Sequence, residues 1–342
     1  MIIRHKIFEK YEDYNFNIPY KSGDRVLVDR GDGLKDGTEL IQKKESSIKY
    51  SFYLPEQIDV QIPKLIEHIN CIDGEFVNKG DVLAEKVSSG GLTVKKLLSP
   101  AQGVVDLTRI ESGYLDLLGE ESEVLIRSNF KGKVEDINPV DGINIVADAY
   151  ALDVLSISDS LIRKRNGRKL VGEFVVLGEG KDLLLRSEGD NYQDKIVFTG
   201  KYLHTELLHD LFEKGALFVL TYSMDYEDFR KQGLPVGVIG GFGEIHSSRS
   251  IMDLISSMDK KLAVVEYDEN QVFFITDDNT YKTKEETFVK SAIGSRVISR
   301  SSANYGMLGN IVSMEEEMFA TVEWEGGQRS IVNIATVEFV SF

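Results

Sequence analysis

A pattern of glycines and aliphatic residues occurs twice in the first 150 residues of the chain. In SPAQGVVDLTRIESGYLDL (99–117) and SNFKGKVEDINPVDGINIV (128–146), a glycine follows a serine by four residues and a valine follows that glycine by two. A second glycine comes ten residues after the first. The polar residues between them differ, as Arg109 against Asn138 shows. The positions that are the same in both copies are glycines, which turns require, and aliphatic residues, which a core requires. The repetition therefore predicts a duplicated β framework and not a catalytic loop.

A shorter repeat lies in the same region. GDGLKDGTEL (31–40) and GEFVNKGDVL (74–83) share two glycines six residues apart, an aliphatic residue midway and a leucine at the end. Around both, apolar residues come in short runs broken by Gly, Asp, Asn and Ser, which is typical of strands and turns. We therefore expect a β domain over residues 1–150. Its repeats could pair within one chain or between two chains.

One part of this region resembles a known family. Its residues Val77, Gly80, Asp81, Leu83, Pro100, Gly103 and Val105 match a pattern of the biotinyl and lipoyl carrier-like fold, the barrel-sandwich hybrid. The segment also resembles the barrel-sandwich hybrid within the large subunits of bacterial RNA polymerase. The resemblance implies a β sandwich with a hairpin that carries a modified lysine. In VSSGGLTVKK, however, Lys95 and Lys96 lie close to Pro100 and lack the flanking methionines of carriers. We expect a structural hairpin with solvated lysines.

Residues 151–285 have a sequence pattern that is typical of an α/β domain. Short apolar runs alternate with amphipathic segments from Asp194 onward. Strands are predicted at 195–200, 216–222, from 234, at 261–267 and at 271–276, and helices at 204–215, 225–233 and 248–258, the last capped by Ser247 or Ser248. This alternation predicts a small parallel sheet with right-handed crossovers.

Ligands of such sheets bind beyond the carboxyl ends of the strands. The candidate ligand-binding residues at these ends are Gly200, Lys201, Tyr222, Ser223, Gly240, Gly241, Phe242 and Gly243. Neither a phosphate-binding P-loop nor a dinucleotide fingerprint is present, and Glu244 beside the glycines would repel a phosphate. A loop used for packing or for partner contact is the favoured interpretation, with a small-molecule site as the alternative.

A basic turn is the candidate nucleic-acid contact. Asn166-Gly167 predicts a hairpin, and five basic residues flank it: Arg163, Lys164, Arg165, Arg168 and Lys169. These could contact RNA or phosphate. A solvated hairpin tip on an acidic protein is the interpretation we favour.

Motifs for catalysis or metal binding are missing from the sequence. His204 and His209 are five residues apart and would not share a helix face. The chain contains no Cys/His cluster and no G-x-S-x-G nucleophile motif. We expect no enzyme, no cofactor and no metal site, and we expect Cys71 to lie in the core.

The last part, residues 290–342, predicts a five-stranded SH3-like barrel. It resembles the KOW module of ribosomal proteins and transcription elongation factors at Val297, Gly306, Gly309, Ile311, Val312, Val322 and Trp324. The resemblance implies binding to RNA or to ribosomal and transcription proteins. From Gly294 onward there are three basic and six acidic residues, which disfavours a phosphate backbone as the ligand. Trp324 and Phe339 are expected in the barrel core.

Composition narrows the class of function. A net charge of −16 over 342 residues disfavours general nucleic-acid binding and suits a basic protein partner. The sequence contains no long apolar run and no signal peptide, and its single cysteine indicates a cytoplasmic protein without membrane contact. The leading hypothesis is a non-enzymatic binding or scaffold protein within a protein assembly. The alternatives are a transcription- or translation-associated factor that contacts RNA or the ribosome, and a ligand-binding or enzymatic α/β domain. The sequence leaves the oligomeric state open.

Overall fold

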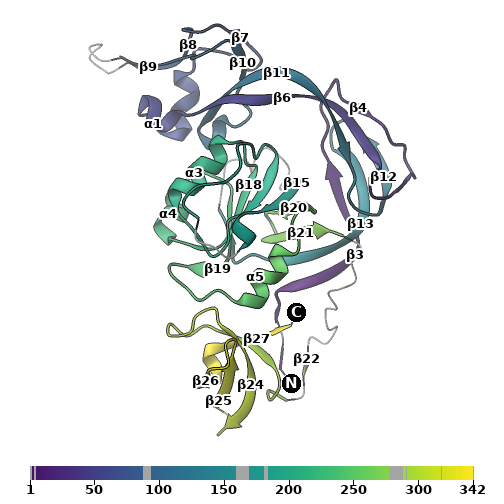
Figure 1. Ribbon diagram of the computed structural model, residues 1–342, viewed down its shortest axis with the longest axis vertical. Coiled ribbons are helices and arrows are strands. Elements are labelled where there is room, and N and C mark those ends of the chain that lie inside the picture. Colours follow the sequence, from purple (N-terminus) through teal and green to yellow (C-terminus); the bar gives the residue numbers. More distant parts are fainter. Residues whose placement is uncertain are drawn as a thin grey trace.

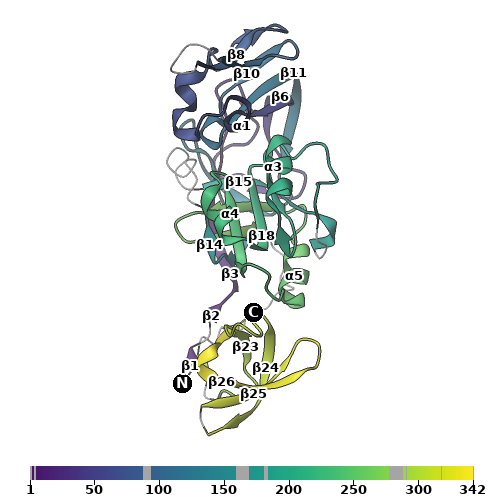
Figure 2. The same ribbon diagram turned by 90° about the vertical axis from the view of Figure 1, so that its left-hand side faces the viewer.

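The chain folds into a row of β-rich parts with an α/β domain between them (Figure 1). This computed structural model describes residues 2–3, 5–87, 94–158, 169–180, 184–276, 288–289, 291–316 and 318–341. Figure 2 shows a β module at the top, the α/β domain in the middle and a small barrel at the bottom. The mainly β architecture with an α/β middle and a C-terminal barrel confirms the predicted fold class. Among the described helices, none is both long and apolar enough to cross a membrane.

The first repeated unit, here called the inner module, covers residues 8–44 and 123–153. Four antiparallel strands form it, in the order β5 (Gly33–Leu34), β12 (Gly132–Asn138), β13 (Gly142–Asp153) and β3 (Phe8–Ile18). The β12–β13 hairpin turns at Gly142, where φ is +99° and a Cβ would lie 2.3 Å from the carbonyl oxygen of Ile18. Only glycine fits there, which explains the glycine of the sequence repeat.

The second unit, here called the outer module, covers residues 50–118 and repeats this design. Its strands follow the matching order β7 (Phe76–Val77), β10 (Gly103–Asp106), β11 (Tyr114–Arg127) and β6 (Glu39–Tyr53). The inner module's β4 (Arg25–Val26) pairs with the first residues of β6. A hairpin covers the core, together with short helical segments: β8 (Val82–Val87), β9 (Val94–Leu98), α1 (Leu54–Ile58), η1 (Ile62–His68) and η2 (Ile110–Ser112). Cys71 is buried in this core, as expected.

The two sequence repeats pair within the chain, each short repeat with one long repeat. In the inner module the amide of Gly31 donates to the carbonyl of Val134, at 2.8 Å. In the outer module the amide of Gly74 donates to the carbonyl of Val105, also at 2.8 Å. The second glycine of each short repeat donates to the serine that opens the long one, and all four bonds have the same length. The structure thereby answers the pairing question that the sequence leaves open.

The outer module is inserted into the hairpin of the inner one. In the outer module, Val82 pairs with Leu98, and a bulge then brings Ala84 opposite Leu97. In the long ribbon of β6 and β11, Glu39 pairs with Arg127 and Ile41 with Ile126, with the shift at the same place. This ribbon therefore corresponds to the β8–β9 hairpin, and it carries the whole outer module at its far end, as Figure 1 shows.

The α/β domain contains four parallel strands, in the order β15 (Lys169–Val176), β16 (Lys195–Phe198), β18 (Phe218–Met224) and β19 (Val236–Phe242). Antiparallel strands flank them: β14 (Ser156–Ile157) beyond β19, and β20 (Leu262–Glu266) and β21 (Gln271–Ile275) beyond β15. The short β17 (Tyr202–Leu203) pairs with β18, and η3 (Gly178–Gly180) follows β15. The strands predicted after Asp194 are present.

Helices cover both faces of this sheet. Leu207, Leu211 and Phe212 of α3 (Thr205–Glu213) are buried with the side chains of one face, where α4 (Tyr226–Lys231) adds Phe229. The opposite face receives α5 (Arg249–Ser256), which is capped by Ser248 as predicted. The helix positions agree with the sequence prediction to within a few residues.

The parallel strands belong to a larger sheet than the small parallel sheet that the sequence predicts. Tyr150 of β13 pairs with Phe274 of β21, so the sheet runs without interruption into the inner module. The predicted border between residues 150 and 151 falls inside β13. Local periodicity marks where a strand begins and ends, but it does not say which neighbour completes its sheet.

The C-terminal barrel is a sheet of β2 (His5–Lys6), β27 (Val337–Ser341), β23 (Arg296–Ser299), β24 (Leu308–Glu315), β25 (Phe319–Trp324) and β26 (Arg329–Asn333). The turn η4 (Ile334–Thr336) precedes β27, and β1 (Ile2–Ile3) pairs with β22 (Phe288–Val289). Trp324 is buried in the barrel core and donates from Nε1 to Ser330 Oγ at 2.6 Å. Phe339 packs against the same core.

Candidate functional site

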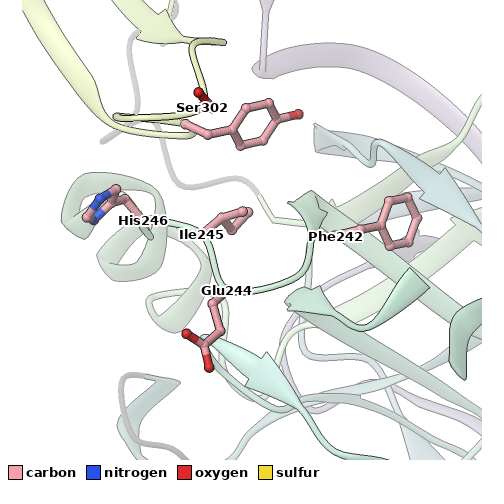
Figure 3. Close-up of a pocket in the computed structure, with 6 residues that line it drawn as sticks. Phe242, Glu244, Ile245, His246 and Ser302 are labelled. Atoms are coloured by element: carbon pink, nitrogen blue, oxygen red, sulfur yellow. The ribbon is translucent and has the colours of Figure 1, made fainter. Parts of the chain in front are cut away.

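A crevice opens where the α/β domain meets the barrel. It has a volume of about 440 Å³ and is lined by Phe242, Glu244, Ile245 and His246 beyond β19, and by Ser302 and Tyr305 of the barrel. Figure 3 shows the two loops facing each other across it. The crevice lies beyond the carboxyl end of β19, which is where α/β sheets bind ligands.

The predicted ligand-binding residues do gather at this end of the sheet, but most of their groups are engaged within the chain. Tyr222 is fully buried, and its hydroxyl donates to the carbonyl of Gly306 at 3.4 Å. Burial raises the pKa of Tyr222 to about 12. Ser223 donates to the carbonyl of Lys201 at 3.0 Å, and the carbonyl of Gly200 accepts from the Tyr222 amide at 2.9 Å.

The glycines of this loop make room for aromatic rings. A Cβ on Gly240 would lie 2.4 Å from the ring of Tyr222, and one on Gly241 would lie 2.8 Å from the ring of Tyr305. Gly243 adopts a φ of +82°, which glycine favours. Of the eight predicted residues, Phe242 is the one that lines the crevice. Gly240 thus makes room for Tyr222 of the neighbouring strand β18, and Gly241 makes room for Tyr305 of the barrel.

The polar side chains round the crevice do not converge on one point. In Figure 3, Glu244 and His246 project in different directions, and Ser302 lies on the opposite wall. Glu244 and His246 are both exposed. Acid–base catalysis needs groups within hydrogen-bond reach of a common reacting atom. The crevice offers apolar and aromatic surface for binding, without such an arrangement among the described residues.

A second contact holds the barrel close to the crevice. Glu325, at the tip of the β25–β26 hairpin, accepts from Ser248 Oγ and from the Arg249 amide at the start of α5, both at 3.0 Å. Ser250 Oγ and Arg296 Nη2 donate to its other oxygen, at 2.6 and 3.0 Å. A carboxylate at a helix N-terminus is stabilised by the helix dipole as well as by these bonds. The barrel is therefore fixed by polar contacts in addition to its share of the common core.

A third contact joins the outer module to α3. Arg109 forms a two-pronged ion pair with Asp116, with both hydrogen bonds at 2.7 Å, and its guanidinium also donates to Ser51 Oγ and to the carbonyl of Phe212. The Asp116 side chain is only 3% exposed. The end of α3 thereby receives a cation at its negative pole.

Aromatic residues pack beside this ion pair. The hydroxyl of Tyr114 lies 3.3 Å from His209 Nδ1, and the ring of Tyr53 packs against both residues. Burial lowers the pKa of His209, and burial raises the pKa of Glu213 in the same helix. His204, the other histidine considered in the sequence, lies at the N-cap of α3 and therefore away from this cluster.

The basic turn lies mostly outside the described residues. Arg163, Lys164, Arg165 and Arg168 belong to the range 159–168, which the structure does not describe. Lys169, the first residue of β15, forms an ion pair with Glu266 at 2.6 Å. This one described member is therefore neutralised by a carboxylate of the chain itself.

Sequence reasoning missed Ser302, Tyr305 and Glu325, which come from the barrel. They lie more than fifty residues beyond β19, and the local pattern gives no sign that they meet it. Gly306 offers one retrospective signal. Its φ of +80° lets the chain pass close to the carbonyl of His246, where a Cβ would lie at 2.6 Å.

No protein-family model matches the chain, and a search of curated proteins gives no match either. Within the described residues, no group of three or more His, Cys, Asp or Glu side chains is placed to hold a metal ion.

Proposed function

We propose that this chain is a non-enzymatic scaffold that holds protein partners within an assembly. The observation that supports this is that polar contacts fix both ends of the molecule to the α/β domain. Arg109 ties the outer module to α3, and Glu325 ties the barrel to α5. A molecule that fixes its parts in this way presents distant surfaces at constant separation, which suits the joint positioning of partners. The acidic net charge of −16 favours basic proteins as those partners.

The test is isolation of the full chain from its own cells at several salt concentrations, followed by native mass measurement. A scaffold gives a stable complex with at least one other protein in fixed stoichiometry. Recovery of the chain alone at every salt concentration contradicts the proposal.

A small-molecule site in the crevice is the second candidate. It is supported by the position of Phe242 and Tyr305 beyond the ends of the parallel strands, at a junction between domains, where ligand pockets are common. Thermal-shift screening of the full chain against nucleotides and metabolites tests it, with Ser302→Trp as the variant that fills the crevice. A ligand that stabilises the native chain but not the variant supports this candidate, and a flat panel counts against it.

A further inference from the structure

The duplication provides an internal comparison of two equivalent surfaces. One row of cross-strand neighbours crosses each module on the outward face of its four strands. In the outer module this row consists of Phe76, Val104 and Leu118, and it continues at Ile48 in the adjoining part of β6. In the inner module the equivalent row consists of Gly33, Lys133, Val146 and Asn15. The same backbone arrangement thus carries an apolar row in one copy and a mostly polar row in the other.

The apolar side chains of Phe76 and of the neighbouring Ile72 are not needed for the fold. Phe76 is 61% exposed, and Ile72 in the turn before it is 72% exposed. The inner module has Gly33 and Asp29 at these positions and adopts the same turn. Its outward face is a polar hollow, lined among others by Lys133, Asn15, Lys131, Glu135 and Asp148. Exposed apolar groups that the fold does not require mark an interaction surface.

The row is closed at one end and open at the other. Ile48 lies against the α/β domain, where its Cδ1 atom is 3.2 Å from the position of a Cβ on Gly215. Phe76 lies on β7, which ends the order of its sheet. The apolar surface therefore continues outward from an interface that the chain already uses, and its open part ends at the edge of the molecule.

Carboxylates stand beside the open part. Asp73, Glu75 and Asp106 accept hydrogen bonds from backbone amides, at 2.7 to 2.8 Å. None of them forms an ion pair with another residue in the described ranges. Over residues 54–117 there are ten acidic and six basic residues. A complementary partner therefore carries positive charge around an apolar centre.

We propose that the open row of the outer module, Phe76 and Val104 with the neighbouring Ile72, docks a protein partner whose contact segment has apolar side chains flanked by Lys or Arg. This rests on the proposed scaffold function and names the surface that performs it. The inner module, with Gly33, Lys133 and Asp29, is the copy without this role.

The chain itself supplies the substitutions for the test. The outer variant, I72D/F76G/V104K, receives the residues of the inner copy. The control variant, L125K/V140E, replaces exposed apolar residues of the inner module with their counterparts Lys96 and Glu111 of the outer one. Each substitution is compatible with the shared fold, because the other copy carries that residue. Melting temperatures of both full-length variants check that they remain folded.

The native chain and both variants are used to isolate complexes from the chain's own cells. A photo-cross-linker replaces Lys79, an exposed residue two positions after the end of β7. We expect recovery of the partner to fall at least tenfold in the outer variant and to stay unchanged in the control variant. The cross-linked peptide should carry Lys or Arg beside apolar residues, and added salt should weaken the complex. Undiminished binding by the outer variant overturns the inference and leaves the scaffold function standing. Equal loss in both variants, or cross-links only to a second copy of the chain, also overturns it. Absence of any partner overturns both proposals.

Discussion

The side chain of Arg109 joins two parts of the molecule that are 103 residues apart in the chain. It neutralises Asp116, which is almost fully buried. Burying a carboxylate is costly unless a cation and hydrogen bonds compensate it. This single residue therefore neutralises the buried Asp116 of the outer module and also holds that module to α3.

Replacing Arg109 by alanine should destabilise the chain strongly. The change leaves Asp116 as an uncompensated buried charge, for which losses of about 3–5 kcal/mol are typical. Urea unfolding measures the free energy of unfolding. The control is Arg230→Ala, which breaks a pair with Glu227 in which both side chains are more than half exposed, and should cost about 0–1 kcal/mol. Equal losses in the two variants would contradict the buried-pair interpretation.

The half-buried imidazole of His209 predicts a pH dependence. Burial lowers its pKa below the ordinary value of 6.5, so the unfolded chain takes up a proton at a higher pH than the folded chain does. Because the unfolded state then binds more protons, this residue makes the protein less stable as the pH falls below 6.5. In His209→Gln, the loss of stability between about pH 7.5 and about pH 5.5 should be smaller than in the native chain.

Thermal unfolding at both pH values measures this difference. His246→Gln is the control, because His246 is exposed, and it should keep the native pH dependence. A native-like pH dependence in His209→Gln would show that the histidine is not responsible.

At the scale of elements, replacing the first glycine of each short repeat by alanine should lower the stability of the chain by the same amount. Gly31 and Gly74 have φ values of +93° and +80°, and no heavy atom lies within 4 Å of a Cβ added to either. Alanine there meets backbone strain alone, which costs about 1–2 kcal/mol. We expect equal falls in the free energy of unfolding for Gly31→Ala and Gly74→Ala. Gly33→Ala, at a position without a positive φ and with the same open space, should be near neutral.

Elements with their own periodicity could be predicted from the sequence. The helix over 204–215 and the strand over 216–222 carry their signals locally, and α3 and β18 are found there. The two repeats also indicated a duplicated framework. What the sequence did not predict is which repeat pairs with which. Gly31 bonds to Val134 across the entire outer module, and no local preference encodes a contact of that length.

The crevice shows the same limit. Gly240 and Gly241 were predicted to belong to a loop used for packing, partner contact or ligand binding, and two aromatic rings pack against them. The sequence could not say that one of these rings, Tyr305, would come from the barrel. Spacing predicts room for an atom, but the identity of the neighbour depends on tertiary packing.

At the scale of the whole molecule, Glu325 should control how tightly the barrel is held. In Glu325→Ala, the Arg249 amide loses its acceptor, so hydrogen exchange at the start of α5 should accelerate. Exchange in β15 and β16 should stay as in the native chain. Glu323→Ala, which removes only a surface pair with Arg329, serves as the control and should leave α5 protected. Unchanged exchange at Arg249 in Glu325→Ala would show that the apolar contacts alone fix the barrel.

The insertion of one module in the hairpin of the other imposes an order on folding. The outer module draws its strands mostly from residues 50–118, whereas the inner one must bring Gly31 and Val134 together from both sides of that segment. Contacts between residues distant in the chain form more slowly, because the intervening loop must first be closed. Once the outer module has folded, its ribbon shortens that loop. We therefore expect pulse-labelled amides of β10 and β11 to become protected before those of β5 and β12, so that the copy proposed to meet partners is also the copy that folds first.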